Sequence, residues 1–226
     1  MTISNRIPSQ YFMTTGKGEW PQHSTKGAGS SLSEDDPFET GSYDVALTDA
    51  GIENANIMKY TSVIPRKAKR ITKAKGTKGL VWGQVLESIM ARADGKHGDR
   101  IAAAVMLTNV SHNGKHLGGF ATEYSGDGNK ATAIATLVRA TRGMIKRRGY
   151  GNLPERADLF GGTWRTSRGY EVSPGAAFTY DSLDVRGDTG TVLAAVCFTA
   201  FDVQILGSAQ TTKRPHRPRR RRKTRR

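Results

Sequence analysis

The sequence predicts an α+β fold in a single domain, in which strands occur in runs and helices are few. Two segments, residues 42–50 and 130–148, show the spacing of helices that bury one face, whereas several other apolar or alternating segments are typical of strands. Strands in runs favour packed layers over a doubly wound parallel sheet. The 226 residues are enough for one sizeable core or two small ones.

In the N-terminal part, residues 7–15 predict a strand. Gly16 and Gly18 follow it closely, which indicates a tight turn or a close approach of two backbones. Residues 20–36 are rich in Ser and Gly and predict a loop.

The next element is the predicted helix over residues 42–50, with apolar side chains at i, i+3, i+4 and i+7. Gly51 stands where a helix C-cap is expected. Residues 52–64 then predict a strand, because Pro65 and the β-formers before it disfavour a helix. Residues 67–78 are polar and basic and predict a surface connector.

The C-terminal half predicts a series of core strands, a hairpin and one long helix. The expected strands are residues 80–90, 101–110, 117–125 and 191–206. Asn113-Gly114 is typical of a two-residue hairpin turn. Residues 130–148 form the clearest amphipathic helix. The Gly-rich segment 149–188 supports no assignment.

Composition indicates a protein without a membrane span and places it in the cytoplasm. Hydrophobic residues make up 36% of the chain, no apolar run is long enough to span a bilayer, and the N-terminus lacks an apolar signal segment. The single cysteine, Cys197, excludes an intrachain disulfide and a cysteine cage for a metal. The histidines lie mostly in polar loops, so no metal site is expected.

The charge is concentrated at the C-terminus. The formal net charge is +15, and residues 213–226 hold ten Lys or Arg and no acid, so the rest of the chain carries +5 (15 − 10). Such a block repels itself and buries no core. We therefore expect a domain over residues 1–210 and a disordered basic tail over 211–226, which is suited to binding polyanions.

Familiar nucleotide, zinc and hydrolase motifs are absent from the sequence. The chain instead resembles the pyruvoyl-dependent arginine decarboxylases, specifically the bacterial branch with Thr before the cleaved bond. The resemblance is carried by Phe38-Glu39-Thr40-x-x-Tyr43-Asp44-x-Ala46-Leu47, Ala50-x-Ile52-Glu53-Asn54-x-Asn56-Ile57, Tyr60-Thr61-Ser62-Val63-Ile64-Pro65, Val85-Leu86-Glu87-Ser88-Ile89-Met90-Ala91, Gly118-Gly119-Phe120-Ala121-x-Glu123-Tyr124 and Cys197-Phe198-Thr199-Ala200. It covers residues 11–125 and part of the last apolar strand.

The resemblance implies an αββα sandwich, assembled as a homotrimer or a dimer of trimers with sites between subunits. It also implies that the chain cuts itself between Thr61 and Ser62, which leaves a β chain 1–61, an α chain 62–226 and a covalent pyruvoyl group derived from Ser62. L-Arginine would form a Schiff base with this group, lose CO2 and become agmatine.

By the same resemblance, Asn56 positions the reacting group and Glu123 is the general acid. From the residues alone, Asn56 is also interpretable as a strand-edge amide bonded to nearby backbone, and Glu123 as an exposed strand glutamate. An apolar strand context would raise the pKa of the Glu123 carboxyl and keep its proton available.

For the substrate's cationic end, the resemblance implies Asp44 as the guanidinium anchor and Leu47 as part of the aliphatic wall. The helical setting of Asp44 also permits a simple acid in the first turn of a helix. Glu87 either helps to bind the guanidinium or pairs with one of the chain's many basic residues.

Two other functions stay open at this point. One is decarboxylation of another amino acid such as lysine, because one carboxylate does not distinguish two cationic side chains. The other is a non-enzymatic nucleic-acid-binding protein that uses residues 66–78 and 213–226. Both basic segments are unusual for the family.

Overall fold

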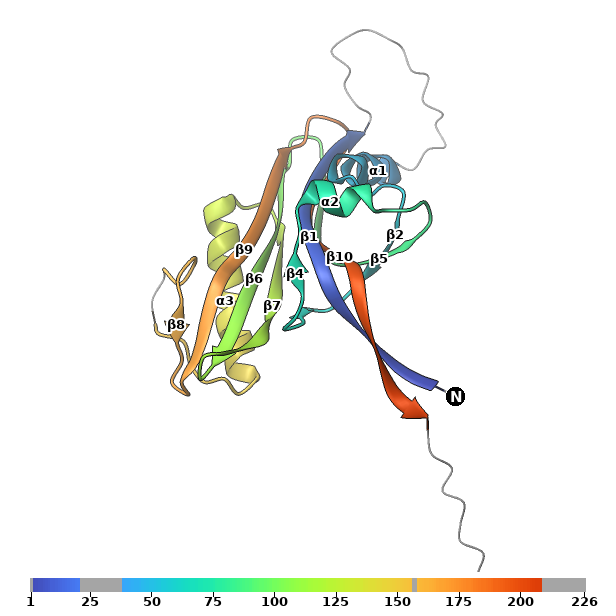
Figure 1. Ribbon diagram of the computed structural model, residues 1–226. Helices are drawn as coiled ribbons and strands as arrows, with labels where there is room; N and C mark the ends of the chain where they lie inside the picture. Colours follow the sequence, from blue (N-terminus) through green and yellow to red (C-terminus); the bar gives the residue numbers. More distant parts are fainter. Residues whose placement is uncertain (1, 21–37, 156–157, 209–226) are drawn as a thin grey trace, which may run out of the picture.

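Two five-stranded sheets form the centre of the molecule, whose computed structural model describes residues 2–20, 38–155 and 158–208 (Figure 1). Sheet A has the strand order β2-β5-β10-β1-β4, and sheet B has the order β3-β7-β6-β9-β8. The strands are β1 (Thr2–Trp20), β2 (Asn56–Lys59), β3 (Val63–Ile64), β4 (Lys69–Arg70), β5 (Val85–Lys96), β6 (Arg100–His112), β7 (Lys115–Gly126), β8 (Trp164–Arg165), β9 (Tyr170–Asp184) and β10 (Thr189–Ser208). The helices are α1 (Phe38–Ala50), α2 (Lys73–Lys78) and α3 (Lys130–Arg147).

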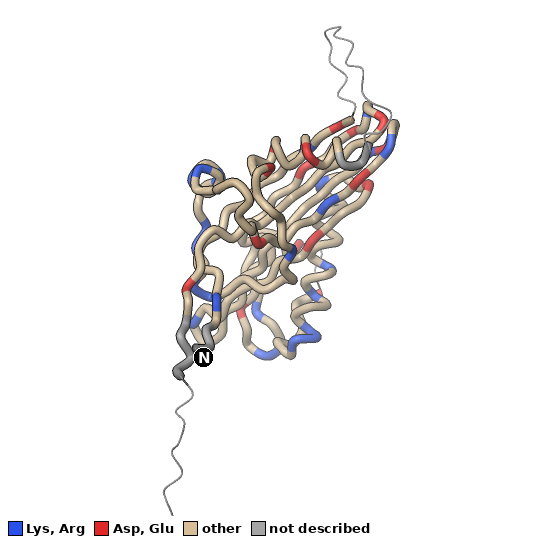
Figure 2. The backbone as a smooth tube through the Cα atoms, turned by 90° about the vertical axis from the view of Figure 1, so that its right-hand side faces the viewer, with Lys and Arg blue, Asp and Glu red and all other residues tan. Residues whose placement is uncertain are grey.

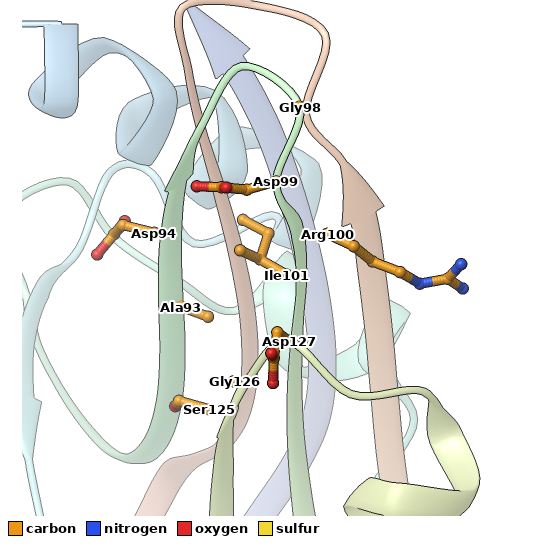
Figure 3. Close-up of a pocket in the computed structure, with 9 residues that line it drawn as sticks. All are labelled: Ala93, Asp94, Gly98, Asp99, Arg100, Ile101, Ser125, Gly126 and Asp127. Atoms are coloured by element: carbon orange, nitrogen blue, oxygen red, sulfur yellow. The ribbon is translucent and has the colours of Figure 1, made fainter.

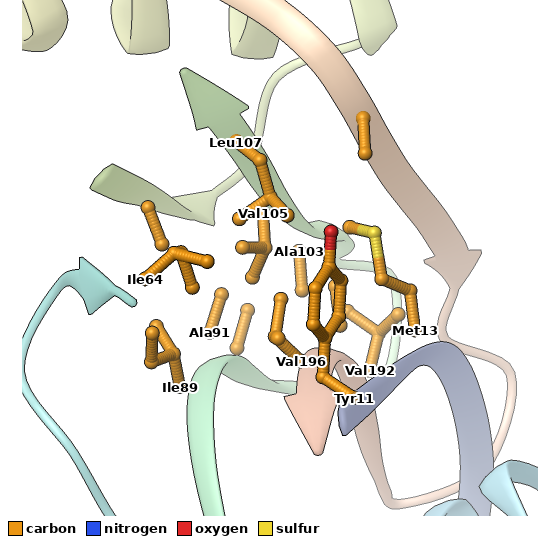
Figure 4. Close-up of a cluster of buried hydrophobic side chains, with 14 of the residues drawn as sticks. Tyr11, Met13, Ile64, Ile89, Ala91, Ala103, Val105, Leu107, Val192 and Val196 are labelled. Atoms are coloured by element: carbon orange, nitrogen blue, oxygen red, sulfur yellow. The ribbon is translucent and has the colours of Figure 1, made fainter. Parts of the chain in front are cut away.

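The main hydrophobic core lies between the two sheets (Figure 4). Sheet A contributes alternate side chains such as Ile89 and Val196, and sheet B contributes Val105 and Leu107 in the same way. Ile64 of the two-residue strand β3 also enters this core, which fixes β3 to the rest of the fold.

The helices cover the outer faces of the sheets. Helix α3 packs on sheet B, where Leu137 and Ile145 are fully buried beside Met106 of β6. Helix α1 packs on sheet A, where Ala46 joins Phe12 of β1 in a third cluster. Because both sheets share one central core, the described residues form a single mixed α and β domain.

Several elements expected from the sequence are confirmed. The two amphipathic segments form α1 and α3. Gly51 follows α1 with a φ of +73°. Asn113 and Gly114 join β6 to β7 with φ values of +50° and +71°, as a two-residue hairpin turn requires.

The glycine pair near the N-terminus makes a close helix contact rather than a turn. Gly16 and Gly18 lie inside β1, which runs to Trp20, and α1 crosses directly over them. A Cβ atom on Gly18 would lie 2.6 Å from the Val45 Cβ and 2.7 Å from the Ala46 nitrogen. The close approach of two backbones, one of the two expectations, is therefore confirmed.

Other boundaries differ from expectation. The predicted strand over residues 52–64 is two short strands in different sheets, because the chain leaves sheet A after β2 and joins sheet B at β3. The basic segment 67–78 is not a plain connector: it contains β4 and α2, and Thr72 caps the helix through Lys75 N. The strand expected from residue 80 begins only at Val85.

The segment without an assignment, residues 149–188, contains β8 and β9, and β9 is a long strand that pairs with β6 and with the edge strand β8. Most of the predicted loop 20–36 and the tail 211–226 lie outside the described residues. Within the described residues, no helix combines the length and the apolarity that crossing a membrane requires.

Candidate active site

The Thr61-Ser62 pair lies where the chain crosses from one sheet to the other. On one side, the Tyr60 N–H donates a hydrogen bond of 2.7 Å to the Ser88 carbonyl of β5. On the other side, the Ser62 carbonyl accepts one of 2.7 Å from the Ala121 N–H of β7. Thr61 is exposed and Ser62 is partly exposed. The peptide bond between them is therefore accessible and held from both sheets.

Glycines in β7 allow β3 to approach closely enough to make this junction. Val63 and Ile64 pair antiparallel with Phe120 and Gly119. Gly118 has a φ of +132°, and a Cβ atom on it would lie only 2.9 Å from the Ile64 carbonyl oxygen. Any larger residue at position 118 would push β3, and with it Ser62, away from β7.

Glu123 lies on β7, two residues beyond the Ala121 that holds Ser62. Its Cα partner is Val105, and both Val105 and Ala121 belong to the core between the sheets, so the Glu123 side chain leaves β7 on the inner face. Desolvation raises the pKa of the Glu123 carboxyl, and the nearby Lys59 ammonium lowers it by less. Glu123 is thus an accessible carboxylic acid with an increased tendency to keep its proton.

Asn56 occupies a different part of the junction. It begins β2, whereas Ser62 follows the end of that strand. Its Nδ2 donates a hydrogen bond of 2.8 Å to the Gly83 carbonyl, and its backbone N–H donates to the Gln84 carbonyl. Within one chain the amide therefore supports the loop before β5, in agreement with the interpretation as a strand-edge amide.

The structure does not bring Asp44 and Leu47 to Ser62 within one chain. Both belong to α1, on the outer face of sheet A. Asp44 is exposed, and Leu47 is buried in the cluster that includes Leu86.

Glu87 pairs with a basic residue of the same chain, which was one of the two expectations for it. Both nitrogens at the tip of Arg6 donate to the two carboxylate oxygens, with Nη2 at 3.2 Å from Oε2. The same carboxylate lies near the Tyr60 hydroxyl and, after burial, is the next cause of the raised pKa of Tyr60. Sequence reasoning missed Arg6 and the side-chain role of Tyr60, because 81 residues separate Arg6 from Glu87 and no local motif links them.

A hollow of about 700 Å³ lies near the turn between β5 and β6, apart from these residues (Figure 3). Asp94, Asp99 and Asp127 line it, and it includes none of the residues singled out in the sequence. The Asp94 carboxylate is already bonded to Arg92 and Thr191.

Comparisons with known proteins point to one family. The sequence model described as pyruvoyl-dependent arginine decarboxylase matches residues 10–203. A Chlamydia pneumoniae protein named pyruvoyl-dependent arginine decarboxylase is 37% identical over 136 residues, covering 55% of this chain and 62% of the relative. A Chlamydia caviae protein of the same name is 38% identical with the same coverage. A Chlorobium luteolum protein named probable pyruvoyl-dependent arginine decarboxylase is 30% identical over 98 residues, covering 43% of this chain and 45% of the relative. The chain thus spans about three fifths of the length of the first two relatives.

Proposed function

Because this chain belongs to the pyruvoyl-dependent arginine decarboxylase family, we propose that it cuts itself between Thr61 and Ser62 and then converts L-arginine to agmatine and CO2. The observation that carries the proposal is the Thr61-Ser62 pair, which lies inside the family match and is held between the two sheets by hydrogen bonds to β5 and to Ala121 of β7. Family membership favours this enzyme over a non-enzymatic nucleic-acid-binding protein.

Self-cleavage needs only groups of the chain and water. The Ser62 hydroxyl attacks the Thr61 carbonyl carbon, and the Thr61–Ser62 amide bond breaks to leave an ester and a free amine. Loss of the Ser62 Cα proton and cleavage of the Cβ–Oγ bond release the Thr61 carboxylate. Water then replaces the nitrogen of residue 62, releasing ammonia and leaving a ketone. The hydrogen bonds that hold Tyr60 and Ser62 support this step, because the Ser62 hydroxyl reaches the Thr61 carbonyl carbon only when the backbone between them is held in a restricted conformation.

A pyruvoyl group at position 62 supplies a ketone that takes up the electrons of the bond broken when CO2 leaves. The residues present fit such a group: position 62 is partly exposed, so substrate can reach it, and β3 fixes it against β7. Glu123 donates a proton to the substrate carbon that lost CO2. Its raised pKa supports this role, because the acid must be protonated at the working pH.

The substrate's guanidinium requires a second copy of the chain, since Asp44 and Leu47 lie away from Ser62 within one subunit. We infer a homotrimer, or a dimer of trimers, of four-layer αββα subunits in which a neighbour's Asp44 accepts the guanidinium and its Leu47 lines the aliphatic part. Asn56 would then complete the site by holding the reacting carbonyl. Exposed apolar side chains flank the cut on the outer strands, Met58 at 52% and Val63 at 50%, and support a covered interface there.

Polyanion binding is a separate part of the proposal. Every Lys and Arg between Arg66 and Lys78 is exposed, and this segment contains no acid. Together with the sequence of the tail 211–226, this distribution supports electrostatic binding of polyanions.

The direct test is the mass of the purified protein under denaturing conditions. We expect two fragments divided between residues 61 and 62, and agmatine and CO2 released from L-arginine at a higher kcat/KM than the corresponding products from L-lysine. Ser62→Ala should give one uncut, inactive chain, whereas Ser125→Ala, a matched change at an exposed serine of β7, should cut normally. A wild-type chain that stays whole and has no carbonyl reactive toward hydrazine would refute the proposal.

A further inference from the structure

Glu87 is the only charged residue that is buried among the described residues, with 2% of its surface exposed. It lies near the start of β5, on the same face as Ile89 and Ala91 of the core between the sheets. A carboxylate in such surroundings is unfavourable unless charged and hydrogen-bonding partners compensate it. The proposed chemistry does not use Glu87, so its partners indicate what it does.

Its ionic partner comes from the part of β1 that extends beyond the two sheets. Figure 1 shows β1 and β10 continuing away from the body as a two-stranded ribbon, in which Arg6 pairs with Val203. The Arg6 side chain reaches back to the Glu87 carboxylate, and its guanidinium lies 3.6 Å from the centre of the Phe201 ring. The two-pronged contact and the ring both fix the direction of the guanidinium.

The third member is Tyr60, two residues before the proposed cut. Its ring centre lies 5.6 Å from that of Phe198, and the Glu87 carboxylate is close enough to its hydroxyl to raise the pKa of Tyr60, second to burial. Its N–H is bound to the carbonyl of Ser88, the residue after Glu87. The backbone of Tyr60 is therefore bound to β5 directly beside Glu87, and its hydroxyl lies near that carboxylate.

This arrangement extends outside the family match, which begins at residue 10. Arg6 precedes that boundary, so the match does not include the residue that neutralises Glu87. The pairing of Arg6 with Glu87 is thus a feature of this chain that the matched region does not contain.

We propose that Arg6, Glu87 and Tyr60 are positioning residues for self-cleavage, an inference that rests on the proposed function. In this arrangement the Arg6 guanidinium orients the Glu87 carboxylate, the carboxylate accepts a hydrogen bond from the Tyr60 hydroxyl, and Tyr60 in turn fixes the backbone that leads to the Thr61 carbonyl. On the C-terminal side of the cut, the chain is held independently by the hydrogen bond from the Ala121 N–H to the Ser62 carbonyl. When the Tyr60 side chain is no longer held, only its backbone bond to Ser88 remains on the entry side, and the Thr61 carbonyl carbon is less well placed for attack by the Ser62 hydroxyl.

The decisive variant is Tyr60→Phe, because it keeps the ring against Phe198 and removes only the hydroxyl. A pulse-labelled chain is made by cell-free translation, and the uncut chain and its two fragments are quantified over time. Because small misplacements of reacting atoms cost about tenfold to a hundredfold in rate, we expect cleavage to slow by about tenfold or more. Tyr11→Phe is the matched control: Tyr11 also packs on Phe198 in this core, and its variant should cut at the wild-type rate.

Variants of Arg6 separate positioning from general stability. Arg6→Met should slow cleavage at least as much as Tyr60→Phe, and Arg6→Lys should restore part of the rate because it keeps the charge without the two-pronged contact. Thermal unfolding of the same changes in the uncut Ser62→Ala chain measures their effect on stability. Once cut, the Tyr60→Phe enzyme should have a wild-type kcat, because position 62 then begins a chain held by β3.

The outcomes distinguish this inference from the function on which it rests. If the wild type cuts itself and Tyr60→Phe and Arg6→Met cut equally fast, the positioning role is wrong and the decarboxylase proposal stands. A cleavage rate that follows only the melting temperature across these variants also overturns the positioning role. If the wild type never cuts, both proposals fail.

Discussion

Replacing Gly16 with alanine should loosen the contact between α1 and sheet A. Gly16 is buried in β1, directly under the last turns of α1. An added Cβ would lie 2.7 Å from the Ala50 nitrogen and 2.9 Å from the Ala50 Cβ, and closer still to the Ala46 carbonyl oxygen. Two of these three atoms belong to the helix backbone, which cannot rotate away as a flexible side chain can. The helix itself must move outward.

The expected loss of folding stability follows from the tight packing at this contact. Overpacking a well-filled core costs typically about 1–3 kcal/mol, and the backbone neighbours place Gly16→Ala at the upper end, about 3 kcal/mol. For a chain of this size, 1 kcal/mol lowers the melting temperature by about 2–4 °C, so a decrease of about 6–12 °C is expected. Displacing α1 also moves Asp44, so arginine decarboxylation should weaken as well.

The assay is thermal unfolding followed by circular dichroism, with Gly16→Ala made in the uncut Ser62→Ala chain and compared at equal protein concentration. Gly79→Ala is the matched control, because Gly79 has a φ of −90° and the nearest atom to an added Cβ is 3.8 Å away. In the same background it should melt at the temperature of the Ser62→Ala parent or slightly above. A Gly16→Ala protein that melts within about 2 °C of the parent would refute the packing argument.

Two further predictions concern ionisable groups. If protonated Glu123 is the acid, activity should fall as pH rises through its raised pKa. Lys59→Met removes the charge that lowers this pKa, so the decrease in activity should occur at higher pH. The control Lys78→Met should leave the pH profile unchanged. A decrease that moves to lower pH in Lys59→Met would contradict the assignment. Burial raises the pKa of the Cys197 thiol to about 12, so iodoacetamide should label the native protein at pH 8 about a hundredfold or more slowly than the unfolded chain, as followed by mass spectrometry. Equal labelling rates in the two states would show that Cys197 is accessible and ionisable.

Local sequence patterns correctly predicted those elements whose structure depends mainly on their own residues. Leu137 and Ile145 repeat at helical spacing, and this spacing predicted α3 because burying one face favours the helix. The same approach failed for residues 67–78: their basic composition indicated a connector, yet Gly76 lets α2 lie directly on the Phe12 ring. That contact depends on β1, which no window around α2 contains.

The sequence by itself determined the helices α1 and α3 and the β6–β7 hairpin, since each depends on residues close together in the chain. It also determined the family and the Thr61-Ser62 pair as the candidate cleavage site, because these depend on the order of several motifs along the chain and not on how the chain folds. Only the tertiary structure decided that this pair crosses between two sheets, that Asp44 lies away from it within one subunit, and that Arg6 neutralises Glu87. These facts depend on strand order and on side chains up to 81 residues apart. The way the sheets assemble determines which charged side chains pair in the folded chain. Such pairs cannot be predicted from residues that are adjacent in the sequence.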